Sequence, residues 1–177
     1  LHSYPGIAPI SPSTLRYAKI LCDLYGLFGA LDNFSIAEIG VGYGGQCRAI
    51  NSTSSPSSYT LIDLQPVLQL SQRYLDHYIM NSQLVYSTMN QLVTREYDLL
   101  ISNYAFTELP RAVQDVYLSR VILPSTRGYI TYNQISPDSF MSYTSDQLLE
   151  LIPGSARINE VPLTHPMNCV IVWGQNG

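Results

Sequence analysis

Apolar residues follow two different patterns along this chain. After Ser11 and Pro12, apolar residues recur at helical spacing and predict a helix that ends at about Gly29. Ser11 offers a capping hydroxyl and Pro12 suits the first turn of a helix. Helical patterns or start signals also predict helices over 46–51, from Pro66, from Pro110 and over 144–152. Between the helices, short apolar runs are typical of buried strands. These runs predict strands at 35–40, 59–63, 83–86, 97–103, 128–132, 156–161 and 168–173.

The order of these elements predicts the fold class. Strand and helix alternate five times, which is typical of a parallel, doubly wound α/β sheet. Only residues 162–167 separate the last two runs, too few for a crossover helix, so the final strand must run antiparallel. A mostly parallel Rossmann-like sheet closed by an antiparallel strand is the layout expected of class I methyltransferases. We expect residues 35–177 to form that unit, and residues 1–34 to form an N-terminal segment whose helix caps the cofactor site.

Length, charge and cysteine content narrow the classes of function. At 177 residues the chain is long enough for one domain with a core. Its net charge of −4 and its single lysine, Lys19, argue against a nucleic-acid partner, which needs a basic surface. No apolar run approaches the roughly 18 residues of a membrane span and no signal peptide opens the chain, so we expect a cytoplasmic protein. Cys22, Cys47 and Cys169 are too scattered for a disulfide framework, and we expect them to be small buried residues.

A glycine-rich turn follows the first of the predicted parallel strands. Glycines at a strand end allow a tight turn and let backbone amides approach a ligand closely. Asp63 ends the next strand, where a carboxylate can accept both hydroxyls of a ribose. The turn follows the pattern E-x-G-x-G-x-G, in which the fixed positions are Glu38, Gly40, Gly42 and Gly44. Tyr43 occupies the variable position between the last two glycines.

Two nucleotide cofactors compete for this turn. Gly40, Gly42 and Gly45 also satisfy the dinucleotide pattern G-x-G-x-x-G, which indicates NAD, and a purely structural turn is a third interpretation. Glu38, two residues ahead of the first glycine, favours S-adenosylmethionine (SAM), because in methyltransferases the acid and the amides frame the amino acid end of that cofactor. The helix ahead of the first strand favours SAM as well. The sequence therefore predicts a SAM site.

Longer segments of the chain carry a family resemblance. They are SPSTLRY (11–17), AEIGVGYGGQCRAI (37–50), YTLIDLQPVL (59–68), YDLLISNYAFTELP (97–110), GYITYNQ (128–134) and THPMN (164–168) before a closing apolar run and WG. Together they resemble a bacterial family of sugar O-methyltransferases within the class I SAM-dependent superfamily. The resemblance implies methyl transfer from SAM to a hydroxyl of a sugar or glycoconjugate precursor in polysaccharide biosynthesis.

Other functions stay open beside this one. The chain could methylate a small molecule that is not a sugar, or serve as a non-catalytic module that binds SAM or a nucleotide. On the dinucleotide interpretation of the turn it would be an NAD-dependent oxidoreductase. The sequence predicts a small-molecule or carbohydrate acceptor as partner and leaves the oligomeric state open.

Methyl transfer to a hydroxyl needs a group that takes the hydroxyl proton. In an open parallel sheet such groups come from loops at the carboxyl ends of the strands. Glu108, after the fourth strand, is the first candidate, because an apolar, aromatic loop makes a carboxylate a stronger base; alternatively it is a helix N-terminal acid ahead of Pro110. His165, in the turn before the last strand, is the second, or else a turn histidine fixed near two prolines.

Four further residues are predicted to bind the cofactor. Asn103 and Tyr104 would line its methionine and methyl end, unless they only terminate the fourth strand. Asn90, after the third strand, would approach the adenine or be an ordinary loop residue. Arg16 would pair with the cofactor carboxylate if the leading helix folds over the site, or else be a solvated helix arginine. No ligand spacing indicates a metal site, and we predict none.

Overall fold

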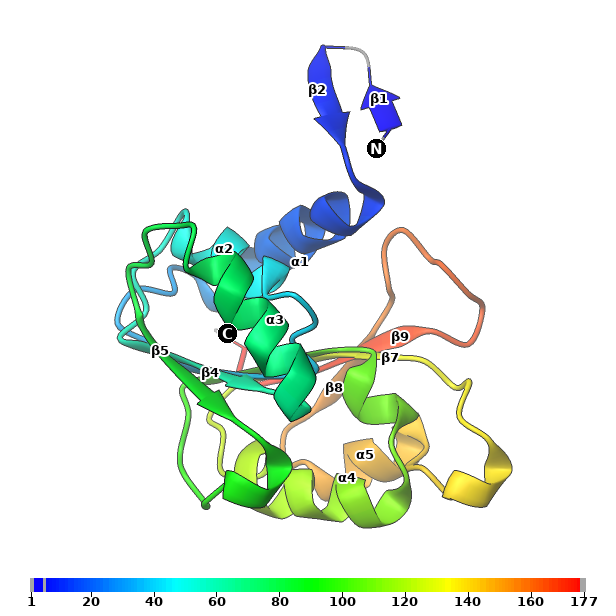
Figure 1. Cartoon of the computed structure of the whole chain (residues 1–177). Coiled ribbons are helices and arrows are strands. Elements are labelled where there is room, and N and C mark those ends of the chain that lie inside the picture. The colour runs from blue at the N-terminus through cyan, green and yellow to red at the C-terminus, as the bar shows by residue number, and fades with distance from the viewer. Residues whose placement is uncertain (1, 5, 176–177) are drawn as a thin grey trace.

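A seven-stranded sheet forms the centre of the molecule (Figure 1). The structure, a computed structural model, describes residues 2–4 and 6–175. Residues 1 and 5 of the predicted segment 1–34, and residues 176 and 177 of the predicted unit 35–177, lie outside the described residues. The strands follow the order β5-β4-β3-β6-β7-β9-β8 across the sheet. Their bounds are β3 Ser35–Ile39, β4 Ser58–Ile62, β5 Gln83–Ser87, β6 Leu99–Asn103, β7 Gly128–Tyr132, β8 Ala156–Ile158 and β9 Cys169–Trp173.

Strand directions confirm the predicted fold class. The five strands β5, β4, β3, β6 and β7 are parallel to one another. The last strand, β9, runs antiparallel to both β7 and β8. It lies between these two strands and not at the edge of the sheet, so β8 forms the edge. Burial of every residue in β4, β7 and β9 fits their continuous apolar sequences.

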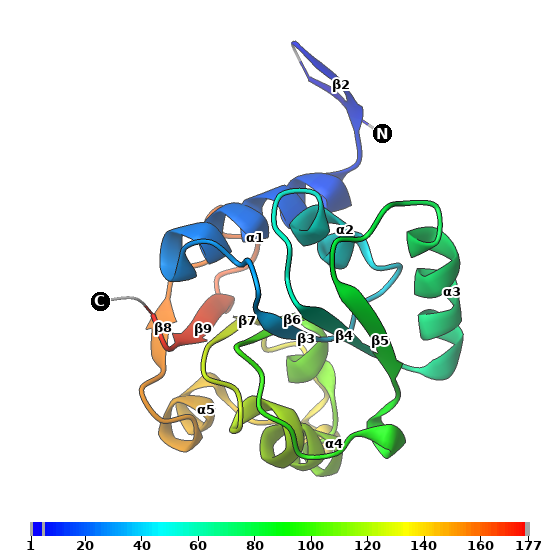
Figure 2. The ribbon, with the colours of Figure 1, turned by 90° about the vertical axis from the view of Figure 1, so that its left-hand side faces the viewer.

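Helices cover both faces of the sheet, giving three layers (Figure 2). On one face lie α1 (Pro12–Phe28), α2 (Gly45–Asn51) and α3 (Gln65–Leu75). On the other lie α4 (Arg111–Tyr117), extended by the π-helical turn Leu118–Ile122, and α5 (Ser145–Leu151). Each face has its own apolar core. Three short 3-10 turns complete the helical elements: η1 (Met89–Gln91), η2 (Ala105–Glu108) and η4 (Asp138–Phe140).

Side-chain caps begin two of the helices, α1 and α5, as the sequence predicts. The Ser11 hydroxyl accepts a hydrogen bond from the Thr14 amide at 3.1 Å and caps α1. The helix ends at Gly29, whose positive φ of 76° suits glycine. Thr144 and Gln147 form the predicted capping box at the start of α5.

Two features of the fold differ from the sequence predictions. An antiparallel hairpin of β1 (His2–Tyr4) and β2 (Ile7–Ile10), which was not predicted, projects from the body ahead of α1 (Figures 1 and 2). Cys47 and Cys169 are buried as expected, but Cys22 is exposed, because its position on α1 faces away from the sheet. Within residues 2–4 and 6–175, no helix is long and apolar enough to cross a membrane.

Candidate active site

The parallel strands bring the predicted site residues to one edge of the sheet. Strands β3, β4, β6 and β7 are in parallel register, so their carboxyl ends lie side by side. The glycine turn follows β3, Asp63 follows β4, and Asn103 is the last residue of β6. Ligands of open α/β sheets bind at this edge. The topology thus gathers residues that are far apart in the sequence.

The glycine turn is held tightly from two sides and stays open at its centre. A Cβ on Gly40, whose φ is 79°, would lie 2.0 Å from the Cβ of Ala105 in η2. A Cβ on Gly45 would lie 2.2 Å from the ring of Tyr17 in α1. Gly42, with a φ of 54°, has nothing within 4 Å of its would-be Cβ. The turn therefore needs glycine for close packing at its ends and presents bare backbone at its middle.

Glu38 is a buried acid just ahead of this turn. Its side chain is 2% exposed, and it accepts one hydrogen bond, from the Tyr59 hydroxyl at 2.7 Å. Burial raises the pKa of the Glu38 carboxyl to about 8, and repulsion from Asp63 adds to the effect, although the hydrogen bond from Tyr59 opposes it. A cationic group placed beside Glu38 would restore its charged form.

Asp63 joins the end of β4 to the glycine turn. One carboxylate oxygen, Oδ1, accepts a hydrogen bond from the Leu64 amide at 2.7 Å, and Oδ2 accepts one from the Gly42 amide at 3.3 Å. The side chain is partly exposed at the edge of the sheet. Each oxygen keeps a free lone pair that can accept a ligand hydroxyl.

A pocket of about 110 Å³ lies between α1 and the glycine turn. Asn103 forms part of its wall, and both polar atoms of the Asn103 side chain are buried without a hydrogen-bond partner. Buried amides are nearly always paired, so the Asn103 side chain has hydrogen-bonding capacity that a ligand in this pocket could use. The other lining residues are Ser13, Arg16, Tyr17, Glu38, Gly40, Val41 and Gly42.

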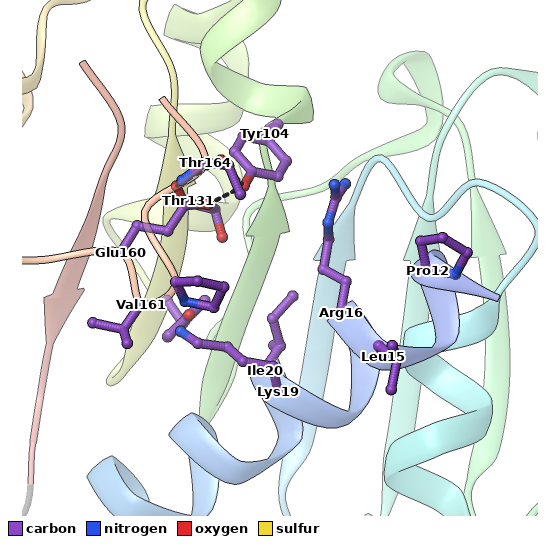
Figure 3. A pocket seen from close by; sticks show the side chains of 12 residues that line it. Pro12, Leu15, Arg16, Lys19, Ile20, Tyr104, Thr131, Glu160, Val161 and Thr164 are labelled. Carbon is purple, nitrogen blue, oxygen red and sulfur yellow. Dashed lines mark hydrogen bonds between the residues drawn. The ribbon is translucent and has the colours of Figure 1, made fainter. Parts of the chain in front are cut away.

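A second pocket of about 260 Å³ adjoins the first and shares Arg16 with it (Figure 3). It lies between α1 and the segment 159–168 that joins β8 to β9. Tyr104 turns its ring into this pocket through a positive φ of 68°, which is strained for a residue other than glycine. The guanidinium of Arg16 lies over that ring, 5.2 Å from its centroid. Burial raises the pKa of the Tyr104 hydroxyl, and its hydrogen bond to Glu160 adds to this.

Glu160 accepts the hydrogen bond of Tyr104 and is the main charge of this second pocket. The Tyr104 hydroxyl donates to Oε1 (Figure 3), while Oε2 accepts from the Thr164 amide at 3.0 Å, the Thr164 hydroxyl at 2.7 Å and the Asn168 amide nitrogen at 3.3 Å. Burial opposes the charged carboxylate, but these four hydrogen bonds outweigh it and lower the pKa of Glu160. The side chain is therefore ionised at neutral pH.

Half of the ten predicted cofactor residues line one pocket, and a sixth, Asp63, is hydrogen-bonded to one of them through the Gly42 amide. Arg16, Glu38, Gly40, Gly42 and Asn103 line the smaller pocket, as described, because α1 folds over the turn. The remaining predicted residues lie elsewhere. Gly44 is the N-cap of α2, Tyr104 lines the larger pocket, Tyr43 packs edge-on against Tyr17 and Tyr74, and Asn90 is exposed in η1 and lines neither pocket.

The two predicted bases lie outside both pockets. Glu108 is exposed and accepts a hydrogen bond from the Asn133 side chain at 2.7 Å, so the apolar surroundings expected for it are not observed. His165 is also exposed, and its Nδ1 accepts from the Met167 amide at 3.2 Å. The segment that carries His165 does reach the site, as its place before an antiparallel strand predicts. It does so through Glu160 and not through the histidine.

The sequence predictions missed Glu160, Thr164, Ser13 and Tyr17. Ser13 lies three residues before Arg16 and four before Tyr17, the spacing of neighbours on a helix surface, so the position of Arg16 on α1 was a usable signal for Ser13. Glu160 falls within the predicted strand 156–161, but β8 ends at Ile158, so the sequence pattern placed this acid in the sheet and not in the loop that reaches the pocket. Among the residues that the structure describes, no three His, Cys, Asp or Glu side chains could together hold a metal ion.

Known structures share this fold. Magnesium protoporphyrin IX methyltransferase from Synechocystis, crystallised with bound SAM, has a TM-score of 0.66 and 12% identity, over 97% of this chain and 87% of that chain. The mitomycin 7-O-methyltransferase MmcR has a TM-score of 0.63 and 12% identity, over 93% of this chain and 54% of that one. The pyocyanin biosynthetic protein PhzM has a TM-score of 0.60 and 19% identity, over 87% and 53%.

These comparisons establish a fold and no narrower family. The chain has the fold of class I SAM-dependent methyltransferases, with the antiparallel final strand predicted for it. It spans about half the length of MmcR and of PhzM. No protein-family model matches the sequence, and no curated protein matches it. The sugar-specific family that the sequence motifs resemble thus gains no support.

Proposed function

We propose that this protein is a methyltransferase that uses SAM to methylate a hydroxyl of a small acceptor. One observation carries the proposal: the unpartnered amide of Asn103 and the buried acid Glu38 face one pocket at the glycine turn. Together they offer hydrogen-bond donors and acceptors and an acid that a cation would stabilise. The amino acid end of SAM has this chemistry. When bound, SAM supplies a methyl group on a positively charged sulfur.

Each end of the cofactor has a candidate partner in this chain. Glu38 and Asn103 would hold the ammonium group, and Arg16 the carboxylate. Asp63 would accept the ribose hydroxyls through the lone pairs it keeps free. Asn90, exposed after β5, would contact the adenine. The bare backbone of Gly42 leaves room for close approach of the ligand between these groups.

The acceptor is proposed more broadly than the cofactor. A hydroxyl acceptor is supported by the pocket beside Arg16, where a tyrosine hydroxyl and a carboxylate are already arranged for proton transfer. The mitomycin enzyme of the same fold is named a 7-O-methyltransferase. A sugar hydroxyl stays a prediction of the sequence motifs. Glu108 and His165 stay candidate bases, both exposed.

Calorimetric titration with S-adenosylhomocysteine (SAH) and with NAD tests the proposal directly. We expect SAH to bind and NAD not to bind. Asn103→Ala should weaken SAH binding by about tenfold, because it removes hydrogen bonds to a charged ligand worth about 1.5 kcal/mol or more. Asn168→Ala, which removes an amide that donates to Glu160 of the other pocket, serves as control for SAH affinity. Binding of NAD without SAH would overturn the proposal.

A further inference from the structure

Several polar groups of the larger pocket are already paired with one another, whereas the Thr131 hydroxyl is buried there without a hydrogen-bond partner. Glu160 accepts from Tyr104, Thr164 and Asn168. Lys19 forms an ion pair with Asp23, whose carboxylate also accepts from the Tyr129 hydroxyl at 2.6 Å. The surfaces that remain for a ligand are mostly apolar or aromatic, from Leu15, Ile20, Tyr104, Tyr129, Val161 and Pro162 (Figure 3).

This chemistry favours one kind of acceptor. A free sugar ring would bring several hydroxyls into the pocket, and each buried group left unpaired costs about 1–3 kcal/mol. A mainly apolar ring with one hydroxyl fills the same space and leaves a single polar group to satisfy. Arg16 closes the pocket toward the glycine turn and stacks on Tyr104. The hydroxyl of such a ring would therefore meet Tyr104 where the two pockets join.

The position of Tyr104 connects the two pockets. Asn103 faces the smaller pocket and the next residue, Tyr104, faces the larger one. The positive φ of Tyr104 directs the two neighbouring side chains into different pockets, and such strain is maintained mainly at functional sites. The Tyr104 hydroxyl keeps a lone pair while it donates to Glu160, so it can accept one more hydrogen bond.

Given the proposed function, on which this inference rests, we propose that the larger pocket holds the acceptor and that the acceptor hydroxyl passes its proton through Tyr104 to Glu160. The acceptor is a largely apolar ring that carries a hydroxyl, such as a phenol. Tyr104 is then the catalytic residue, because it contacts the acceptor. Glu160 acts through Tyr104, as a positioning residue that receives the proton.

The reaction balances in atoms and charge. The bond from the sulfur to the methyl group breaks with its electron pair left on sulfur, and a bond from the acceptor oxygen to that methyl group forms. The acceptor proton moves to Tyr104 Oη as the Tyr104 proton moves to Glu160 Oε1. The products are an ether, a neutral thioether, neutral tyrosine and a protonated Glu160. A weakly basic carboxylate suffices because the acceptor oxygen becomes acidic as it gains the methyl group, and Glu160 then loses the proton to solvent.

Nuclear magnetic resonance tests the acceptor site without any turnover. Protein labelled with carbon-13 at tyrosine Cζ and saturated with SAH is titrated with 4-methylphenol or with methyl glucoside, and the Tyr104 signal is identified from Tyr104→Phe. We expect 4-methylphenol to shift the Tyr104 signal and methyl glucoside to leave it unchanged. Tyr143, which also donates to a carboxylate, Asp115, is the internal control and should not shift. The inference would be overturned if neither compound changed the chemical shift of the Tyr104 signal, or if only methyl glucoside changed it.

Kinetics with 4-methylphenol, whose hydroxyl keeps its proton at neutral pH, then test the proton path. Tyr104→Phe and Glu160→Gln should lower kcat by about 10²-fold or more, the range of general base catalysis, with KM and SAH affinity within about threefold of wild type. The low-pH limb of the wild-type kcat profile should disappear in Glu160→Gln. Tyr143→Phe should keep wild-type kcat. Binding of the phenol without methyl transfer, or a near-normal kcat in Glu160→Gln with a loss in Glu108→Gln, would contradict the path. Absence of SAH binding would instead contradict the proposed function.

Discussion

Two regions at the carboxyl edge of the sheet contain the same three groups: a tyrosine, a carboxylate that accepts its hydrogen bond, and an arginine over its ring. In one, Tyr104 donates to Glu160 under the guanidinium of Arg16, at 5.2 Å from the ring centroid. In the other, Tyr143 donates to Asp115 at 2.7 Å under Arg111, at 3.5 Å. Each tyrosine borders a pocket of about 260 Å³. The local contacts alone do not separate the two regions.

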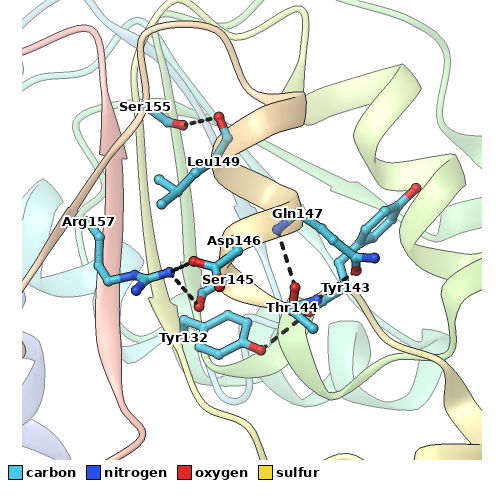
Figure 4. A network of polar contacts seen from close by, with 9 residues as sticks. All are labelled: Tyr132, Tyr143, Thr144, Ser145, Asp146, Gln147, Leu149, Ser155 and Arg157. Carbon is cyan, nitrogen blue, oxygen red and sulfur yellow. Dashed lines mark hydrogen bonds and ion pairs between the residues drawn. The ribbon is translucent and has the colours of Figure 1, made fainter.

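The difference lies in what surrounds each tyrosine. Around Tyr143 the polar groups satisfy one another: Arg111 also donates to the Met141 carbonyl and to the side chain of Gln147, and Gln147 belongs to the capping box of α5 (Figure 4). Beside Tyr104, in contrast, Asn103 has no partner and Glu38 is buried next to the glycine turn. A positive φ does not separate the regions, because Met141 beside Tyr143 has one of 49°. Unsatisfied polar groups, and not the tyrosine–carboxylate pair itself, distinguish the first region as the candidate site.

Gly40→Ala should have the largest effect on the site region. The new methyl group would lie 2.0 Å from the Cβ of Ala105, and the positive φ of 79° would strain any residue other than glycine. We expect a loss of about 2–4 kcal/mol in the free energy of unfolding, measured by urea denaturation, and loss of SAH binding.

A second substitution separates the collision from the backbone strain. The double variant Gly40→Ala with Ala105→Gly removes the collision and keeps the strain. It should recover more than half of the lost stability, leaving a deficit of about 1 kcal/mol. Equal stability of the single and double variants would show that packing between the turn and η2 does not hold the site together.

Much of the fold could be predicted because it follows from local sequence. Alternating strands and helices, the caps at Ser11 and Thr144, and the short link before the last strand each depend on neighbouring residues. The fold class and the antiparallel final strand are accordingly confirmed. The hairpin 2–10 was missed because two short strands without an apolar pattern give no periodicity to recognise.

The site could be predicted only in part. The glycine turn, Asp63 and Asn103 follow strand ends, and the topology places all strand ends at one edge. The pairing of Tyr104 with Glu160 joins residues 56 positions apart and depends on how one loop lies, so no local pattern indicates it. Burial, which raises the pKa of Glu38, and the hydrogen bonds that lower the pKa of Glu160 likewise depend on tertiary packing and not on residue type.

Glu38 gives the second prediction, on binding and pH. With the pKa of Glu38 raised to about 8, the empty folded protein holds a proton that the unfolded chain releases above its pKa of about 4.5. The free energy of unfolding should therefore fall as pH rises through this window. If the ammonium group of SAH lies beside Glu38, binding at pH 7 should release up to one proton, and SAH should bind up to about tenfold tighter per pH unit toward pH 8.

Calorimetry in phosphate and in Tris, whose ionisation enthalpies differ, measures that proton. Glu38→Gln should abolish the proton release, flatten the pH dependence, and weaken binding by about tenfold. Asp115→Asn, in the region of Tyr143, should keep the proton release and the pH dependence of SAH binding. If Glu38→Gln released as many protons on SAH binding as the wild type, Glu38 would not lie beside the ammonium group of the cofactor.

Glu160→Gln gives the third and smaller prediction, on stability. Hydrogen bonds lower the pKa of Glu160 in the folded state, so its contribution is fully present above its unfolded value of about 4.5 and is lost as pH falls below that. We expect the variant to lose about 1–2 kcal/mol in the free energy of unfolding at pH 7. The gap to wild type should shrink at pH 3.5 in urea titrations. A gap that is equal at both pH values would show that Glu160 acts by packing and not by charge.

Tyr143→Phe should have the smallest effect, and it tests the comparison itself. The substitution removes one hydrogen bond to an exposed carboxylate, while Arg111 keeps its bonds to Met141 and Gln147. We expect a loss of about 0.5–1 kcal/mol in urea denaturation and no change in SAH affinity by calorimetry. Because the polar groups around Tyr143 are hydrogen-bonded to one another, loss of its hydroxyl should not change the hydrogen bonds available to SAH. If Tyr143→Phe weakened SAH binding as much as Asn103→Ala does, the two regions would act as one site, and unsatisfied polar groups would no longer distinguish them.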